Sequence, residues 1–171
     1  MSYNSYETER LFLRPTALED APFVLELLNT PKWIKNIGKR DVKTVAEAED
    51  YIRLKMTPQL ERLGYSNYTI IRKSDGAKMG SSGLYDREGL PGVDIGFALL
   101  PQYERKGYGF EAAKRIIQAG LEDFDLKVIQ GITNKENIAS QKLLEKIGLK
   151  FHKFITLPDE DEEIMLFRYI I

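Results

Sequence analysis

The stretch DIGFALLPQYERKGYGFEA, Asp94 to Ala112, passes from a strand pattern to a helical pattern through a turn rich in glycine and basic residues. Apolar residues then recur at the spacing of a buried helical face: Ala113, Ile116, Ile117, Gly120, Leu121 and Phe124. The free N–H groups at a helix N-terminus attract anions, and Gly107 and Gly109 let a ligand approach the backbone closely. Arg105 and Lys106 add charge that suits a pyrophosphate better than a carboxylate. The stretch predicts an anion-binding strand–turn–helix unit; the alternative is a tight turn with solvated cations.

Composition limits what else the chain can be. With 171 residues, 43% of them hydrophobic, we expect a single domain over 1–171. A net charge of -1 gives no general attraction for nucleic acid. The absence of cysteine excludes disulfides, thiolate metal sites and an acyl-cysteine intermediate, and a single histidine argues against a histidine-based zinc site or triad. The chemistry must therefore use carboxylates, hydroxyls, amides and the backbone.

Location and assembly are predicted less directly. The sequence has no apolar run of the length that a membrane span needs, and the polar start MSYNSYETER does not resemble a signal peptide. We therefore expect a cytoplasmic protein without a membrane partner. The apolar segment EIMLFRYII is compatible with pairing between two copies, so a monomer and a homodimer both remain open.

The rest of the chain predicts a mixed α/β layer structure. TERLFLRP alternates like a half-buried strand, and a helix follows through Phe23 to Leu28. TVAEAEDYIRLKMTPQLERLG predicts a helix capped by Thr44 and Glu47, kinked at Pro58 and closed by Gly64. A hairpin around Asp75 and Gly76 comes next. Four further segments predict strands: GVDIGFALL, LKVIQGI, LKFHKFITL and EIMLFRYII. The segment NIASQKLLEKIG, between the second and third of these, predicts a helix.

Two common phosphate-binding patterns do not fit the turn. Gly107, Gly109 and Ala112 match the dinucleotide pattern G-x-G-x-x-G/A, but no acidic residue stands at the end of the following strand to bind a ribose. The chain also lacks room after the turn for a full doubly wound sheet. The nucleoside-triphosphate pattern G-x-x-x-x-G-K-[ST] does not occur.

Two stretches taken together, DIGFALLPQYERKGYGFEA and NKENIASQKLLEKIGLKF, resemble the acetyl-coenzyme A site of the GNAT N-acetyltransferases. The opening ETERLFLRPTALEDAPFVLELLN is similar to the branch that contains the ribosomal-protein alanine acetyltransferases. The resemblance implies a twisted, mixed but mostly antiparallel sheet with helices on both faces. It also implies central strands that splay apart to pair with the pantetheine arm. The pyrophosphate would lie on the amides of Arg105, Lys106, Gly107, Tyr108, Gly109 and Phe110.

The same resemblance implies direct attack by a primary amine in a ternary complex, with no covalent intermediate and no metal. Backbone N–H groups at Phe97, Ala98 and Leu99 would polarise the thioester. The Ser140 hydroxyl would act near the sulfur, Asn137 would hold the pantetheine arm, and Lys142 would approach the adenosine phosphate. A role as helix caps is the competing interpretation of Asn137 and Ser140.

For the general base we name Asp94, which alternation places on the strand face opposite Ile95; the alternative is an ordinary solvated residue. The resemblance puts Trp33 and Ile34 in a loop at the acceptor pocket, as a substrate lid or as a core anchor. Tyr68 would line the acceptor groove or pack beneath it. His152 and the acidic run PDEDEE are expected to be structural and solvated, respectively.

The sequence departs from the family pattern at two positions. Glu104 stands where the family turn begins with Gln or Arg, and Leu144 stands where many members carry a tyrosine that protonates the thiolate. The acceptor is open between a protein N-terminal amine and a small-molecule amine such as an antibiotic. A non-catalytic module that senses acyl-CoA is the alternative from another class.

Overall fold

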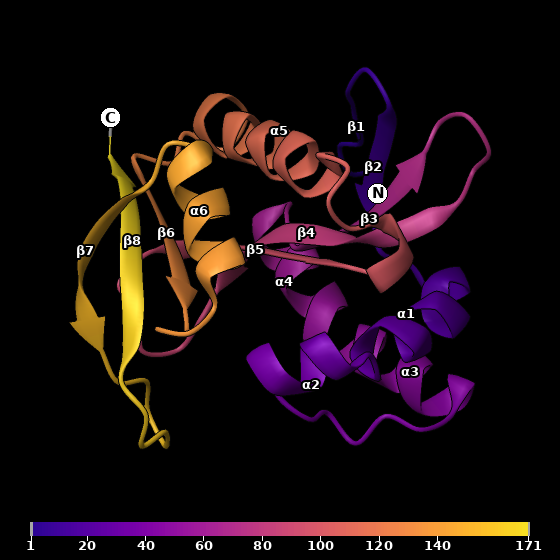
Figure 1. Ribbon diagram of the computed structural model, residues 1–171. Coiled ribbons are helices and arrows are strands. Elements are labelled where there is room, and N and C mark those ends of the chain that lie inside the picture. The colour runs from indigo at the N-terminus through magenta and orange to yellow at the C-terminus, as the bar shows by residue number, and fades with distance from the viewer. Residues whose placement is uncertain (1, 171) are drawn as a thin grey trace.

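In the computed structural model, which describes residues 2–170, eight strands form one sheet in the order β1-β2-β3-β4-β5-β6-β8-β7 (Figure 1). Only β5 and β6 run parallel, and every other neighbouring pair is antiparallel. The predicted mixed, mostly antiparallel sheet is therefore confirmed. The strands are β1 Tyr6–Glu7, β2 Leu11–Pro15, β3 Asn67–Arg72, β4 Lys78–Asp86, β5 Val93–Leu99, β6 Val128–Thr133, β7 Lys150–Ile155 and β8 Ile164–Ile170.

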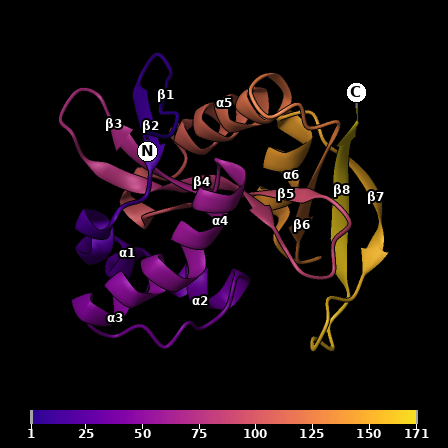
Figure 2. The same ribbon diagram turned by 180° about the vertical axis from the view of Figure 1, so that it is seen from behind.

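Helices cover both faces of the sheet, as Figures 1 and 2 show from opposite sides. On one face, α5 packs on a core that includes Leu84, Ile95 and Ile116. On the other face, α1 and α3 share a second core with Leu100. The helices are α1 Ala21–Leu28, α2 Pro31–Asn36, α3 Val45–Tyr51, α4 Thr57–Leu63, α5 Tyr108–Glu122 and α6 Ile138–Lys146. Among residues 2–170, no helix is long and apolar enough to cross a membrane.

The long helix predicted before β3 is divided into two by a wide turn. The Thr44 side chain accepts the N–H of Glu47 at 3.1 Å, and Gly64 ends α4 in a left-handed conformation at φ 85°, as predicted. Between α3 and α4 the backbone forms a π-helical segment, Ile52–Met56, and Pro58 lies in the first turn of α4. Because proline has no N–H and its ring clashes with the carbonyl four residues earlier, the regular helical hydrogen-bond pattern is interrupted there.

The segment NTPKWIKNIG, which we expected to be a loop, contains the short helix α2. The Thr30 side chain accepts the N–H of Trp33 at 3.3 Å, and Pro31 occupies the first helical position. A proline that follows a helix can mark its end, but a proline after a threonine equally favours the start of a new helix. The prediction of a loop is therefore wrong.

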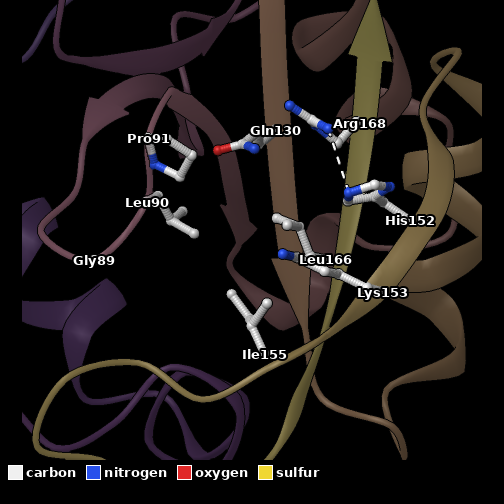
Figure 3. Close-up of a pocket in the computed structure, with 9 residues that line it drawn as sticks. All are labelled: Gly89, Leu90, Pro91, Gln130, His152, Lys153, Ile155, Leu166 and Arg168. Carbon is white, nitrogen blue, oxygen red and sulfur yellow. Dashed lines mark hydrogen bonds between the residues drawn. The ribbon is translucent and has the colours of Figure 1, made fainter.

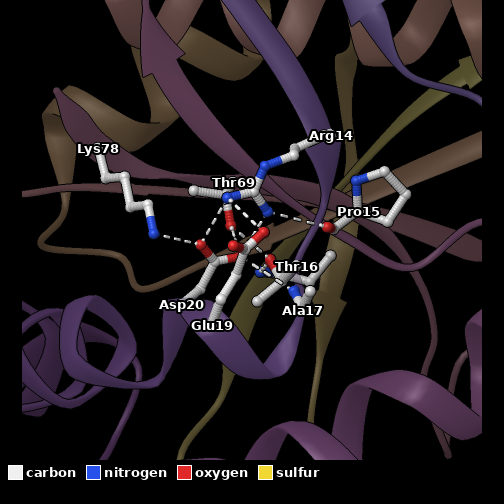
Figure 4. Close-up of polar contacts among 9 residues, drawn as sticks. Arg14, Pro15, Thr16, Ala17, Glu19, Asp20, Thr69 and Lys78 are labelled. Carbon is white, nitrogen blue, oxygen red and sulfur yellow. Dashed lines mark hydrogen bonds and ion pairs between the residues drawn. The ribbon is translucent and has the colours of Figure 1, made fainter. Parts of the chain in front are cut away.

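The buried carboxylate of Asp20 fixes the start of α1 to the sheet (Figure 4). Asp20 is 0% exposed and binds Arg14 of β2 and Lys78 of β4, each at 2.7 Å. Its Oδ2 also accepts the Ala17 N–H and the Thr69 hydroxyl. Burial by itself would raise the pKa of Asp20, but the hydrogen bonds from Arg14 and Lys78 lower it to about 2. The contact holds the start of α1 against β2, β3 and β4.

Candidate active site

The central strands β5 and β6 splay apart, as the resemblance implied. They pair at only two positions, Val93 with Ile129 and Asp94 with Gln130. The other edge of β5 stays paired with β4 along its whole length, and the other edge of β6 stays paired with β8. From Ile95 and Gly131 onward, the facing edges of β5 and β6 therefore present N–H and C=O groups without a partner strand. An extended ligand that carries amides can add to such edges.

The glycine turn at the end of this opening has the geometry of an anion site. Gly107 is the N-cap of α5 at φ 83°, and Arg105 is also left-handed at φ 63°. The first N–H groups of α5 have no partner within the helix, and they point out of the turn. The sequence predicted a glycine turn at the start of this helix but not the left-handed conformation of Arg105, for which residue type gives no signal.

The turn is supported by a residue from the other end of the chain. The Arg10 Nη1 donates to the carbonyl oxygen of Lys106 at 3.0 Å, and its Nε donates to Glu111 Oε1 at 2.7 Å. The guanidinium also lies 4.3 Å from the centre of the Tyr108 ring. Sequence reasoning missed Arg10, because nothing local connects the loop before β2 with α5.

Glu104, the first departure from the family pattern, forms an ion pair with Lys32 of α2. The carboxylate is thereby neutralised beside the turn instead of facing a phosphate as an unpaired charge. The pair also ties α2 to the turn. This arrangement leaves the backbone N–H groups of the turn as its candidate anion-binding groups.

At the N-terminus of α6, Asn137 is the cap residue, and its Oδ1 accepts the N–H of Ser140 at 3.2 Å. The capping role that we held as an alternative is thus observed for Asn137, whereas the half-buried Ser140 contributes only its backbone to the cap. Lys142 is exposed on the same helix. Leu144 is buried against β6, where a Cβ on Gly131 would lie 2.5 Å from the Leu144 Cδ2, so this position is part of the core.

Asp94 is 1% exposed, so the alternative of a solvated strand residue is wrong. Its Oδ1 lies 3.2 Å from the Arg87 Nε. Burial raises the pKa of Asp94, and the Arg87 charge opposes that rise. A buried carboxyl at the point where the strands separate is a candidate for proton transfer.

Tyr85 lies directly across from Asp94 on β4, and sequence reasoning missed it. Its ring covers two glycines: a Cβ on Gly96 would lie 2.6 Å from the ring, and one on Gly83 would lie 2.8 Å from the hydroxyl oxygen. Burial raises the pKa of Tyr85, so the hydroxyl stays protonated at neutral pH. The sequence signal for this aromatic ring was the presence of Gly83 and Gly96 in two neighbouring strands. Only the strand register shows that both glycines lie under the Tyr85 ring.

The Tyr85 hydroxyl begins a chain of hydrogen bonds that ends at Asp20. It donates to Asn67 Oδ1, and the Asn67 Nδ2 donates to the Thr16 hydroxyl at 2.8 Å. Thr16 and Thr69 are joined at 2.8 Å, and Thr69 donates to Asp20 at 3.1 Å. Hydrogen bonds arranged head to tail strengthen one another and fix the direction of each hydroxyl.

A pocket of about 320 Å³ opens between α2, the start of α6 and the β7–β8 loop. It is lined by Lys35, Asn36, Asn134, Glu136, Asn137, Ile138, Ala139 and Glu162. Trp33 and Ile34 precede this lining on α2: Trp33 packs on the α1–α3 core, and Ile34 is exposed. Glu162 belongs to the acidic run that we expected to be only a solvated turn.

Tyr68 does not lie with these residues. It is 1% exposed and belongs to the core beneath α5, where its ring centre lies 5.7 Å from that of Tyr6. The Trp33 side chain of α2 packs against the core on the other face of the sheet. The expectation that Tyr68 lines the acceptor groove is therefore corrected in favour of core packing.

The sequence family described as "Acetyltransferase (GNAT) domain" matches residues 10–150. The chain belongs to this family. It is similar to an uncharacterized N-acetyltransferase p20 of Bacillus licheniformis, with 31% identity over 91% of this chain and 86% of that protein. The GNAT assignment makes it an N-acetyltransferase, and the family fold implies that it binds acetyl-CoA.

Solved structures share the GNAT fold of this chain over its whole length. An acetyltransferase from Agrobacterium tumefaciens aligns with a TM-score of 0.85 and 23% identity, covering 100% of this chain and 96% of that one. A ribosomal L7/L12 alpha-N-protein acetyltransferase in complex with coenzyme A aligns with a TM-score of 0.79 and 16% identity, covering 96% of each. At these identities the likeness shows the fold alone.

Proposed function

We propose that this GNAT enzyme moves the acetyl group of acetyl-CoA to a primary amine by direct attack in a ternary complex. The observation that carries the proposal is the splay of β5 and β6 between the turn of α5 and the pocket beside α2. A coenzyme lying in that opening would place its thioester between the two strands. An acceptor in the pocket would then approach the same point from the other end.

The coenzyme is proposed to bind mainly through backbone groups. The amides of Arg105 to Phe110 would hold the pyrophosphate, since they form the positive end of α5. The free edge of β5 at Phe97 to Leu99 would pair with the pantetheine arm and polarise the thioester oxygen. Asn137 would contact the same arm, and Lys142 would attract the adenosine phosphate.

The reaction forms one bond and breaks one. The neutral amine attacks the carbonyl carbon, a C–N bond forms, and the C–S bond breaks. Asp94 would accept the proton that the amine loses, directly or through a water molecule. The Ser140 hydroxyl or water would pass a proton to the thiolate and regain one from Asp94, so the enzyme returns to its starting state. An N-terminal amine, with a pKa of about 8, needs less help than a lysine amine at about 10.

For the acceptor we favour a protein N-terminal amine. Two carboxylates, Glu136 and Glu162, line the pocket with one cation, Lys35, and this balance attracts a free ammonium group. The fold is compatible with this class, because the L7/L12 alpha-N-protein acetyltransferase shares it. A small-molecule amine is the second candidate, because about 320 Å³ lies at the low end of the volume typical for small ligands.

The test is acetyl transfer measured by release of free coenzyme A thiol, with three matched sets of acceptors. These are peptides with a free N-terminus, the same peptides with a blocked N-terminus and one free lysine, and small amines including aminoglycosides. We expect turnover with the free N-termini and little with the blocked peptides. Turnover confined to small amines would replace the favoured acceptor class. Tight acetyl-CoA binding without turnover on any amine would support the sensor and refute the enzyme mechanism.

A further inference from the structure

A second pocket, of about 140 Å³, lies on the other side of β6 from α6 (Figure 3). Because side chains alternate along a strand, Gly131 faces α6 and Gln130 faces this pocket. The pocket lies between the loop before β5 and the strands β7 and β8. It is lined by Gly89, Leu90, Pro91, Gln130, His152, Lys153, Ile155, Leu166 and Arg168.

Two buried polar atoms in this lining have no hydrogen-bond partner among the described residues: Gln130 Oε1 and Arg168 Nε. The whole Gln130 side chain is 1% exposed, and Figure 3 shows its amide directed across the pocket toward Pro91. Proline has no N–H, so the backbone at Pro91 offers no donor to the amide. Buried polar groups are nearly always satisfied, so these two atoms indicate that a polar occupant belongs in the pocket.

The lining determines the charge of that occupant. Arg168 Nη1 and His152 Nε2 lie 3.3 Å apart, and arginine can only donate, so the imidazole accepts this bond. The other edge of the guanidinium, formed by Nε and Nη2, can donate to a hydrogen-bond acceptor. Neither Arg168 nor Lys153 forms an ion pair within residues 2–170. Among residues 2–170, no carboxylate lines the pocket. Asp94, which lies beside Gln130 on the neighbouring strand, already forms an ion pair with Arg87.

We propose that this pocket binds a small oxyanion, a carboxylate or phosphate group, on the Nε edge of Arg168. That edge presents two parallel N–H donors, which match the spacing of two oxygens of such a group. Lys153 adds charge at the rim. The Gln130 amide oxygen has no partner among residues 2–170, so the amide can turn to present its NH₂ group. A water molecule occupies about 30 Å³, so the pocket is large enough for a small anion but not for a coenzyme.

The single histidine of the chain makes this site directly observable. Protein labelled with ¹⁵N-histidine would be titrated at pH 7 with sodium phosphate and, separately, with sodium acetate, each against sodium chloride of equal ionic strength. We expect the His152 ring signals to shift and saturate below about 10 mM oxyanion. The salt that binds with the lower Kd identifies the class of oxyanion, and chloride gives no saturable shift.

Variants assign the effect to the pocket. Arg168→Gln should weaken binding by at least about tenfold, whereas Arg62→Gln, which removes an exposed arginine of α4, should leave it unchanged. If Arg168→Gln fails to fold, Lys153→Gln at the exposed rim should still weaken binding severalfold. Equal shifts with oxyanion and chloride, or equal binding in wild type and both pocket variants, would mean that water satisfies Gln130 and Arg168 and would overturn the proposal.

Discussion

Arg10 and Glu111 join the loop before β2 to the first turn of α5. The Nε of Arg10 donates to Glu111 Oε1 at 2.7 Å, and the backbone N–H of Arg10 donates to Oε2 at 2.9 Å. The hydrogen bond from the Thr8 hydroxyl to the same carboxylate completes the contact. Since Arg10 also binds the Lys106 carbonyl, the pair holds the proposed pyrophosphate turn in place before any coenzyme arrives.

Removal of this support should weaken coenzyme binding. In Arg10→Ala, the turn loses its bond to the Lys106 carbonyl, and we expect the KM for acetyl-CoA to rise about tenfold with a smaller change in kcat. Steady-state kinetics would check this, with Arg53→Ala as the control, because Arg53 forms an exposed ion pair within its own helical segment. If the KM for acetyl-CoA changes equally little in Arg10→Ala and Arg53→Ala, the turn is stable without Arg10.

Gly107 allows the strongest test of the turn itself. Its φ is 83°, and an added Cβ would lie 3.2 Å from Arg10 Nη2, so Gly107→Val both strains the backbone and crowds the turn. Gly76 is the matched control, because its φ is 73° and nothing lies within 4 Å of an added Cβ. Both variants should lose about 1–2 kcal/mol of stability. Only Gly107→Val should lose acetyl-CoA affinity, by more than about tenfold in calorimetric titration, with NADH as a ligand that neither protein binds.

Ser140 and Asn137 can be separated, because only Asn137 provides a side-chain cap. We expect Ser140→Ala to lower kcat about tenfold or more, with KM and melting temperature little changed, since the hydroxyl is proposed to act on the sulfur. Asn137→Ala should instead cost about 1 kcal/mol of stability through the lost cap. If Ser140→Ala lost stability and kept its turnover, the hydroxyl would be structural.

The substitution Asp94→Asn should lower activity without lowering stability at neutral pH. Burial raises the pKa of Asp94, so the folded state binds the proton more tightly than the unfolded chain does. The contribution of Asp94 to stability is then full below about pH 4 and is lost as the pH rises through the raised pKa. Asp94→Asn should therefore be at least as stable as wild type at pH 7, while kcat falls about 100-fold.

The pH profile of kcat provides the second measurement on Asp94. With saturating substrates, the acidic limb should lie above the ordinary range of an aspartate and should disappear in Asp94→Asn. A variant with wild-type turnover and the same acidic limb would remove Asp94 from the mechanism, and the base would have to be sought elsewhere, with Glu136 and Glu162 as the next carboxylates to test.

Asp20 has the reverse dependence on pH. Its pKa is lowered to about 2, so its ionised form contributes stability that is present above about pH 4 and is lost as the pH falls toward 2. Asp20→Asn should lower the free energy of unfolding at pH 7 by about 3 kcal/mol, because Arg14 and Lys78 lose their shared partner. Denaturant unfolding at pH 7 and pH 3 would check this. The difference between wild type and variant should shrink at pH 3; a constant difference would exclude the ionised carboxylate as its source.

Local patterns in the sequence were sufficient to place most of the elements. The hairpin at Gly76, the cap at Thr44 and the glycine before α5 each depend on neighbours within a few residues, and each was predicted correctly. The α2 helix was missed because Pro31 is equally suited to follow one helix and to begin the next. Tyr68 was misassigned because alternation along a strand does not say which face meets which layer of helices.

The sequence by itself determined the place of most strands and helices, the glycine turn and, through resemblance, the family. These depend on periodicity and on the conformational freedom of single residues, which are local properties. Only the tertiary structure decided that Asp94 is buried beside Tyr85, that Arg10 supports a turn formed by residues far along the chain, and that Gln130 and Arg168 line one pocket. Those relationships depend on strand register and on contacts between distant segments, and no single stretch of sequence records them.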